Sequence, residues 1–287
     1  MVRLFRWLSR WPLWLLHGVG ATLGWATYLG SPTYRRRFDA NVRRAGIAPR
    51  TARPAIAAAG RMVAELPFLW MRPAAAPIGP SLQWHGESVL RDALQSGRGV
   101  VLLTPHLGCF EVTAQAIAQV HAAEFGPLTV LFRPARKALL REVTGAARAR
   151  PGLATAPATL AGVRQMIRAL RRGEAVGLLP DQVPPEGMGV WVPFFGEPAY
   201  TMTLAARLVQ QTGAVPVLIW GERLARGAGF AVHVSGLGET LPTTDPAQAE
   251  SAALITRAME RLIRECPHQY LWGYNRYKQP RASGSAA

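Results

Sequence analysis

The longest uncharged stretch of the chain lies near its amino terminus. From Trp11 to Tyr34 there is no Asp, Glu, Lys or Arg, and three arginines precede the stretch while three more follow it. Its apolar centre, residues 13–29, would be ~26 Å long as a helix at ~1.5 Å per residue, close to the ~30 Å of a bilayer core. The pattern predicts a hydrophobic helix within residues 1–36 that anchors the chain in a membrane or lies in its interface.

Two arrangements of this helix fit the sequence equally well. It either spans or re-enters the bilayer as a short anchor, or it lies in the interface as an amphipathic helix. Tryptophans near both ends, including Trp7, Trp11 and Trp25, are typical of interfacial anchors. They and the missing A-x-A site argue against a cleaved signal peptide. Because arginines flank both ends, charge does not determine the topology of the segment.

Beyond residue 36, strand-like and helix-like patterns alternate. Continuous apolar runs predict strands at 97–106, 127–134, 174–182, 214–224 and 229–236. Apolar positions at helical spacing predict helices at 110–120, 135–149, 160–174, 200–212 and 246–266. Apolar strands that alternate with helices predict an α/β fold with a mainly parallel, buried central sheet flanked by helices.

This pattern divides the chain into four parts. Residues 37–80 are predicted to be a helical, membrane-proximal segment that follows the hydrophobic helix. The α/β domain is expected over 81–280, with the Pro- and Ala-rich stretch 73–82 as the candidate linker before it. Residues 281–287 are predicted to be a disordered tail.

Charge narrows the choice of partners. The 33 basic residues exceed the 17 acidic ones, which gives a net charge of +16 and favours an anionic partner. Residues 1–72 hold twelve arginines against Asp39 and Glu65, so +10 of this charge belongs to the most apolar end of the chain. Basic and apolar character together indicate a membrane surface. No zinc-finger or RNA-recognition signature supports a nucleic acid as partner.

The segment TPHLGCFEV, residues 104–112, carries the candidate chemistry. His106 follows a predicted strand, where open α/β sheets place their ligand sites, and Gly108 allows a tight turn. Glu111 lies in the first turn of the next helix, so the two side chains can meet across the junction. A carboxylate on one imidazole nitrogen fixes the tautomer and stabilises the cation formed when the other nitrogen takes a proton. The segment therefore indicates His106 as a general base oriented by Glu111, for acyl transfer from a thioester to an alcohol.

Spacing alone leaves other interpretations open. A histidine and a glutamate at a helix start also form purely structural polar pairs, because the helix dipole favours Glu there. The sequence evidence for a metal site is weaker than that for a catalytic pair, because HLGCFE lacks the H-E-x-x-H arrangement. Cys109 and Cys266 form no metal or disulfide pattern, which suits a reducing, cytoplasmic-side location.

HLGCFE resembles the H-x4-(D/E) motif of the glycerolipid acyltransferase superfamily. In detail it is similar to the H-L-G-x-x-E form of the late acyltransferases of lipid A biosynthesis, the lauroyl/myristoyl acyltransferase family. Three further blocks resemble that family in the same order: LFRP (131–134), LLPDQVPPEGMGVWVPFFGEPAYT (178–201) and QYLWGYNRYK (269–278). The resemblance covers about residues 85–280. Cys109, Phe110 and the stretch 273–275 depart from the family's usual residues, so catalytic chemistry carries over better than the identity of the acceptor.

The resemblance implies a set of site residues. His106 and Glu111 would be catalytic, and Arg133 would bind phosphate or the reacting carbonyl oxygen. The remaining substrate-binding positions implied by the resemblance are Asp181, Gln182, Phe194, Phe195, Gly196, Thr201 and Arg276. Phe194 and Phe195 also fit a place in the core or in the wall of an acyl-chain pocket.

The resemblance also implies partners and a location. The donor would be an acyl-acyl-carrier-protein and the acceptor a hydroxyl of a lipid A precursor, with no cofactor and no metal. The enzyme would work at the inner membrane with its catalytic domain facing the cytoplasm. The alternatives are an acyltransferase for a lysophospholipid or aminolipid, a non-catalytic lipid-binding protein, and a hydrolase with Cys109 as nucleophile.

Overall fold

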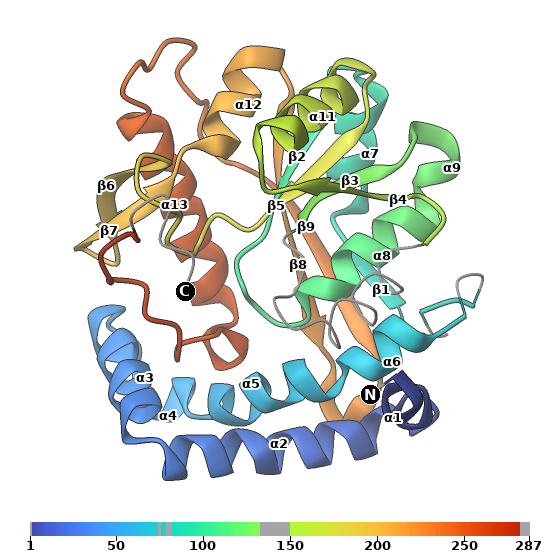
Figure 1. The fold of residues 1–287 in the computed structure, drawn as a ribbon, viewed down its shortest axis with the longest axis vertical. Helices are drawn as coiled ribbons and strands as arrows, with labels where there is room; N and C mark the ends of the chain where they lie inside the picture. The colour runs from blue at the N-terminus through green and yellow to red at the C-terminus, as the bar shows by residue number, and fades with distance from the viewer. Residues whose placement is uncertain (1, 74–75, 79–81, 133–149, 282–287) are drawn as a thin grey trace.

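A seven-stranded sheet forms the centre of the computed structural model, which describes residues 2–73, 76–78, 82–132 and 150–281. The strands lie in the order β1 (Leu82–His85), β9 (Phe230–Gly236), β8 (Val215–Arg223), β2 (Val100–Leu103), β5 (Ala175–Leu178), β3 (Leu128–Phe132) and β4 (Leu153–Pro157). Neighbouring strands are parallel except for the antiparallel pair β8 and β9. The predicted α/β fold with a mainly parallel sheet is confirmed (Figure 1).

The central strand β2 explains why the sheet is covered on both sides. All four of its side chains are buried. Val101 and Leu103 belong to one hydrophobic core, while Val100 and Leu102 belong to the other, because successive side chains of a strand point to opposite faces. A strand whose side chains are apolar on both faces of the sheet is buried when helices cover both of those faces.

Each face has its own helices (Figure 1). One core contains side chains of α11 (Leu160–Arg171), α12 (Leu204–Thr212) and α13 (Ala249–Glu265). The other contains side chains of α7 (Glu87–Gln95) and α8 (Phe110–Val120), and the short helix α9 (Ala122–Phe125) packs beside α8. The predicted helices 110–120, 160–174 and 246–266 are thus present, whereas 135–149 lies outside the described residues.

A separate antiparallel hairpin interrupts one predicted helix. It consists of β6 (Gly189–Phe194) and β7 (Glu197–Met202), so the helix expected from residue 200 begins only at Leu204. The turn residues Phe195 (φ 49°) and Gly196 (φ 81°) both have positive φ, as a two-residue type I′ turn requires. Glycine is at ease in this region, whereas Phe195 must be held there by its packing.

The amino-terminal helices form a layer along one side of the α/β unit (Figure 1). They are α1 (Val2–Leu8), α2 (Leu13–Gly30), α3 (Pro32–Arg44), α4 (Pro49–Ala52), α5 (Pro54–Ala64) and α6 (Leu66–Met71). Phe38 of α3 and Ile56 of α5 share a core with Leu103 of the sheet. In the described part of the chain, no helix has both the length and the apolar character needed to cross a bilayer.

Glycines let α2 and α5 approach closely. A Cβ on Gly24 would lie 2.2 Å from the carbonyl oxygen of Ile56, and one on Gly60 would lie 1.9 Å from that of Gly20. These distances are shorter than any van der Waals contact, so only glycine fits where the two backbones meet. The packing turns His17 of α2 inward, where its side chain is 8% exposed.

Candidate active site

His106 and Asp181 meet because their strands are neighbours. β2 and β5 are parallel, with Leu103 opposite Leu178, and each residue follows its strand by three positions. The carboxyl ends of parallel strands lie at the same edge of the sheet, which is where open α/β folds bind ligands. Asp181 is 3% exposed, whereas the His106 side chain keeps 17% of its surface accessible.

Asp181 holds both the backbone and the ring of His106. Its Oδ2 accepts the His106 backbone N–H at 2.9 Å, and its Oδ1 lies 2.7 Å from Nδ1 of the ring. The Tyr270 hydroxyl donates to Oδ2 at 3.3 Å, which gives the Asp181 carboxylate a third hydrogen bond. Burial raises the pKa of that tyrosine well above its usual range. Burial also acts to raise the pKa of Asp181, but His106 and its two N–H donors outweigh this effect and hold the Asp181 pKa below its ordinary value.

The second ring nitrogen of His106 faces a side-chain amide. Nε2 lies 3.1 Å from Nε2 of Gln182, the residue next to Asp181. An ionised carboxylate only accepts hydrogen bonds, so Nδ1 carries the proton and Nε2 of the neutral ring is left as an acceptor for the Gln182 amide. The ring therefore presents an unprotonated nitrogen at the more accessible side of the site.

The turn after His106 depends on close backbone contact with β8. Gly108 has φ 56°, and a Cβ there would lie 1.9 Å from the carbonyl oxygen of Gly221. The Cys109 backbone N–H donates to that carbonyl at 2.7 Å, and the Gly108 N–H donates to the carbonyl of Gln269 at 3.1 Å. The tight turn expected at Gly108 is present, and it aims His106 back toward Asp181.

Glu111 keeps its predicted place in the chain, and its role as the partner of His106 stays a prediction. It lies in the first turn of α8 as predicted, but its Oε2 accepts a hydrogen bond from the indole N–H of Trp70 at 3.3 Å. Asp181, rather than Glu111, binds Nδ1 of His106. The physical reason is strand order, because β5 brings Asp181 beside the end of β2. Phe110, the residue before Glu111, packs edge-on against the His106 ring with 5.0 Å between the ring centroids.

An apolar cavity of about 430 Å³ opens beside His106 and Gln182. Its walls come from the end of β5, from α11 and from the segment that joins β5 to the hairpin. The apolar side chains that line it include Leu131, Val163, Leu178, Met188, Met202 and Leu204. The arrangement can hold an alkyl chain with its reacting end at the imidazole.

The remaining predicted residues lie in the hairpin and the carboxy-terminal segment. Phe194 and Phe195 are buried, and Phe195 packs near Trp272 with 6.0 Å between ring centroids. Arg276 donates to Thr201 Oγ1 and, at 2.7 Å, to the carbonyl oxygen of Tyr200. Gly196 forms the hairpin turn. These contacts join the hairpin to the carboxy-terminal segment that also carries Tyr270. They therefore stabilise the position of Tyr270 next to Asp181. Arg133 lies outside the described residues.

A buried ion cluster in contact with the turn at Gly108 is not apparent from the sequence. Glu65 accepts from Arg223 through both carboxylate oxygens, at 2.6 and 2.8 Å, and lies 3.0 Å from Nε2 of His17. The same guanidinium donates to the carbonyl oxygen of Gly108. The only sequence signal is that Glu65 is one of two acidic residues in a strongly basic segment.

Fold and site together define a class of protein: a parallel α/β protein with a histidine–carboxylate pair at the carboxyl edge of its sheet, beside an apolar cavity. The sequence pattern of the bacterial lipid A biosynthesis acyltransferases matches residues 49–279, and the chain belongs to this family.

Curated relatives agree with this assignment. The chain is 26% identical over 195 residues to the lipid A biosynthesis palmitoleoyltransferase of Escherichia coli, covering 68% of this chain and 60% of that protein. It is 27% identical over 194 residues to the lipid A biosynthesis lauroyltransferase of the same organism, covering 67% and 60%. A lipid A biosynthesis acyltransferase of Shigella flexneri is 26% identical over 195 residues. The chain thus spans 60% of the length of the relatives it matches.

Proposed function

We propose that the protein transfers a fatty acyl group from an acyl-acyl-carrier-protein to a hydroxyl of a lipid A precursor. The observation that carries this proposal is the His106–Asp181 pair at the mouth of the apolar cavity. Membership of the lipid A acyltransferase family supports the reaction and the class of acceptor. A lysophospholipid acceptor would use the same chemistry and is separated from this proposal by the assay below.

The proposed reaction needs no covalent enzyme intermediate. His106 Nε2 removes the proton of the acceptor hydroxyl, displacing the amide of Gln182, as the oxygen attacks the thioester carbonyl carbon. The new C–O bond forms and the C–S bond breaks, and the proton passes from His106 to the departing thiolate. Asp181 remains ionised, holds Nδ1–H and stabilises the imidazolium formed between these steps.

The charge that develops on the carbonyl oxygen needs a donor. Arg133, assigned to this role or to a phosphate contact by the family resemblance, belongs to a segment outside the described residues. The amide of Gln182 is a described donor at the reacting edge, 3.1 Å from Nε2 of His106. We propose that it turns from the imidazole to the substrate when the acceptor arrives.

Cys109 is a poor nucleophile in this site. The thiol is 1% exposed, and burial raises its pKa well above the ordinary value. A neutral, enclosed thiol does not attack esters or thioesters. The geometry therefore favours transfer to an external hydroxyl over hydrolysis through a cysteine intermediate.

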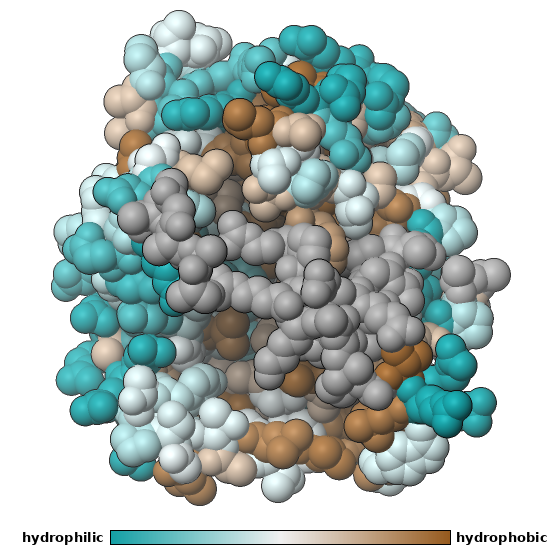
Figure 2. Space-filling view, in the orientation of Figure 1, coloured by the Kyte–Doolittle hydropathy of each residue, from teal (hydrophilic) through white to brown (hydrophobic). Residues whose placement is uncertain are grey.

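We further propose that the protein works at the cytoplasmic face of the inner membrane. Apolar side chains of α2 are exposed, including Val19 (42%), Leu23 (55%) and Leu29 (64%). Figure 2 shows hydrophobic groups along the edge of the molecule where α2 lies in Figure 1. Twelve arginines lie in the same region of sequence, residues 1–72. Exposed apolar groups flanked by arginines suit contact with anionic lipid headgroups.

The test is acyl transfer from a labelled acyl-acyl-carrier-protein to lipid A precursor and, separately, to lysophospholipids. His106→Gln should lower transfer by at least about 10²-fold, because a general base of this kind contributes about 10²–10⁴-fold. His85→Gln on the edge strand β1 is the matched control and should keep wild-type activity. Transfer only to lysophospholipid would refute the proposed acceptor, and an active His106→Gln protein would refute the proposed base.

A further inference from the structure

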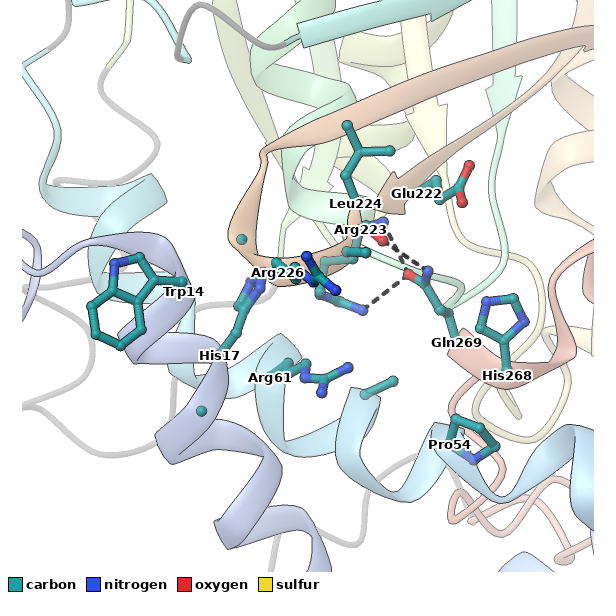
Figure 3. Close-up of a pocket in the computed structure, with 14 residues that line it drawn as sticks. Trp14, His17, Pro54, Arg61, Glu222, Arg223, Leu224, Arg226, His268 and Gln269 are labelled. Carbon is teal, nitrogen blue, oxygen red and sulfur yellow. Dashed lines mark hydrogen bonds between the residues drawn. The ribbon is translucent and has the colours of Figure 1, made fainter.

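A second pocket lies between the amino-terminal helices and the β8–β9 hairpin. It has a volume of about 440 Å³ and shares no lining residue with the cavity at His106. Residues of α2, α5 and the short helix η1 (Ala225–Gly227) of the hairpin surround it, and His268 and Gln269 close one end. Figure 3 shows Arg61, Arg223 and Arg226 approaching the same space from α5 and from the hairpin.

The three guanidinium groups are not equally neutralised. Arg223 is paired with Glu65, as described above. Arg61 and Arg226 take part in no salt bridge among the described residues, and the buried Nε of Arg61 has no hydrogen-bond acceptor within that part of the chain. Glu222 is the acidic residue that lines the pocket, and it lies 2.9 Å from His233. Positive charge from Arg61 and Arg226 therefore lines the cavity, while the Nε of Arg61 is buried without an acceptor among the described residues.

The surroundings of Arg61 make this arrangement costly without a ligand. Burial, together with the nearby charge of Arg223, lowers the pKa of Arg61. A buried N–H donor that makes no hydrogen bond also loses the free energy it would gain in water. An anion between Arg61 and Arg226 would offset the effect of burial and of Arg223 on the Arg61 charge, and a phosphate group suits the fork-shaped guanidinium better than a monodentate ligand does.

The rim of the pocket is apolar. Trp14 lines it and keeps 60% of its surface exposed, and its backbone lies against Gly227 of the hairpin. Pro54, Ala58 and Leu224 line other parts of the wall. A charged floor beside an exposed tryptophan on α2, whose exposed residues continue to Leu23 and Leu29, matches a ligand with a phosphate and an attached hydrocarbon part.

We propose that this pocket binds the phosphate headgroup of an anionic lipid, separately from the catalytic cavity. The proposal rests on the membrane-surface location given under the proposed function, but not on the catalytic role of His106. The lipid is either the acceptor, held by one of its phosphates, or a neighbouring membrane phospholipid. Because Arg223 also donates to the carbonyl oxygen of Gly108, the occupied pocket lies directly behind the catalytic turn.

The binding experiment uses dihexanoyl phosphatidic acid, which is soluble as a monomer, titrated calorimetrically into the protein in phosphate-free buffer. Arg61→Gln should weaken binding by about ten-fold or more, and Arg226→Gln by a smaller factor of about five, because charge-assisted hydrogen bonds from a partly buried group contribute most. Arg171→Gln, on the exposed end of α11, removes the same charge and should leave the Kd unchanged. Arg226 is exposed on η1, so its variant remains informative even if Arg61→Gln fails to fold.

Two further ligands test the chemistry. Dihexanoyl phosphatidylcholine, which is zwitterionic, should bind at least about ten-fold more weakly than phosphatidic acid. Inorganic phosphate that binds as tightly as the lipid would overturn the proposal in favour of a free-phosphate site. Equal losses in all three arginine variants would overturn it in favour of non-specific charge attraction, and loss of acyl-carrier-protein binding in Arg61→Gln alone would assign the pocket to the donor instead.

Competition between phosphatidic acid and the acceptor in the transfer assay distinguishes the two possible sources of the lipid. Inhibition of acyl transfer by phosphatidic acid that is competitive with the acceptor, and is weakened in Arg61→Gln, would identify the acceptor phosphate as the natural occupant. Binding without competition would identify a neighbouring membrane lipid. A His106→Gln protein that loses transfer but keeps lipid binding separates this site from catalysis, so failure of one proposal does not imply failure of the other.

Discussion

At the scale of single residues, the catalytic proposal depends on which carboxylate holds His106. Two acidic side chains lie near the carboxyl end of β2, but they have different partners. Asp181 binds the imidazole at 2.7 Å and the backbone N–H of the same residue, whereas Glu111 accepts from Trp70. A partner that binds both ring and backbone fixes the orientation and the tautomer of the histidine together, which is what a general base requires.

Asp181→Asn is therefore expected to lower kcat by about 10²–10⁴-fold with a smaller change in KM. The amide can donate to Nδ1 and thereby favour the tautomer whose Nε2 is already protonated. Steady-state transfer kinetics over a range of pH, together with urea unfolding of the variant, separate this effect from a loss of stability.

Glu111→Gln provides the comparison at the same scale. The amide can still accept a hydrogen bond from Trp70, and we expect its kcat to fall at least about ten-fold less than in Asp181→Asn. A larger loss in Glu111→Gln than in Asp181→Asn would restore the pairing that the H-x4-E spacing suggested and would refute Asp181 as the orienting group.

At the scale of elements, the contact between α2 and α5 positions the amino-terminal layer. Three glycines occupy the crossing of these helices, where Gly24 faces the carbonyl oxygen of Ile56. The same contact places Trp14 and His17 of α2 beside Arg61 of α5 at the proposed lipid pocket. A change in the spacing of the two helices would therefore alter the shape of the pocket as well as the stability of the protein.

Gly24→Ala should lower the free energy of unfolding by about 1–3 kcal/mol, because its Cβ would overlap the backbone of α5. Gly18→Ala in the same helix is the matched control, since its Cβ meets no atom within 4 Å. There the higher helix propensity of alanine should raise stability by about 0.5–1 kcal/mol. Urea denaturation measures both, and equal effects would contradict the close helix packing.

At the scale of the whole molecule, one ion cluster connects three regions that are far apart in sequence. His17, Glu65 and Arg223 join the amino-terminal helices to β8, and Arg223 also donates to the carbonyl oxygen of Gly108 in the turn after His106. Burial acts to raise the pKa of Glu65, but Arg223 and His17 outweigh it and lower that pKa below its ordinary value of 4.5. The ionised pair contributes to stability above pH 4.5, and this contribution is lost as the pH falls through the lower pKa of the folded state.

Glu65→Gln should consequently reduce the free energy of unfolding by about 3–5 kcal/mol at pH 7, because it leaves Arg223 buried without its counter-ion. The difference from the wild type should shrink as the pH falls below 4.5, where the wild-type carboxylate also begins to lose its charge. Glu239→Gln, which removes an exposed pair with Arg257, is the control and should cost less than about 1 kcal/mol at either pH. A difference between wild type and Glu65→Gln that does not change with pH would contradict this account.

The sequence by itself determined the features that depend on local pattern. Apolar runs such as 97–106 and 214–224 predicted strands, and they proved to be buried strands of the central sheet. Short segments with weak patterns were missed: β1 has only four residues, and β4, with the sequence LATAP, has little strand propensity. The predicted helix 200–212 includes the last residues of β7, whereas the rest of the hairpin is not predicted, because its residues carry no strong strand signal.

The tertiary structure alone decided which side chains meet. His106 could be identified from its place after a strand, but its partner could not, because Asp181 lies 75 positions away and reaches it only through the adjacency of β2 and β5. The charge of residues 1–72 indicated an anionic partner. That Arg61 and Arg226 line the same pocket follows only from the arrangement of α5 and the β8–β9 hairpin in the folded chain. Periodicity reports the environment of each residue along the chain; contacts between distant segments follow from strand order and helix packing, which local sequence does not encode.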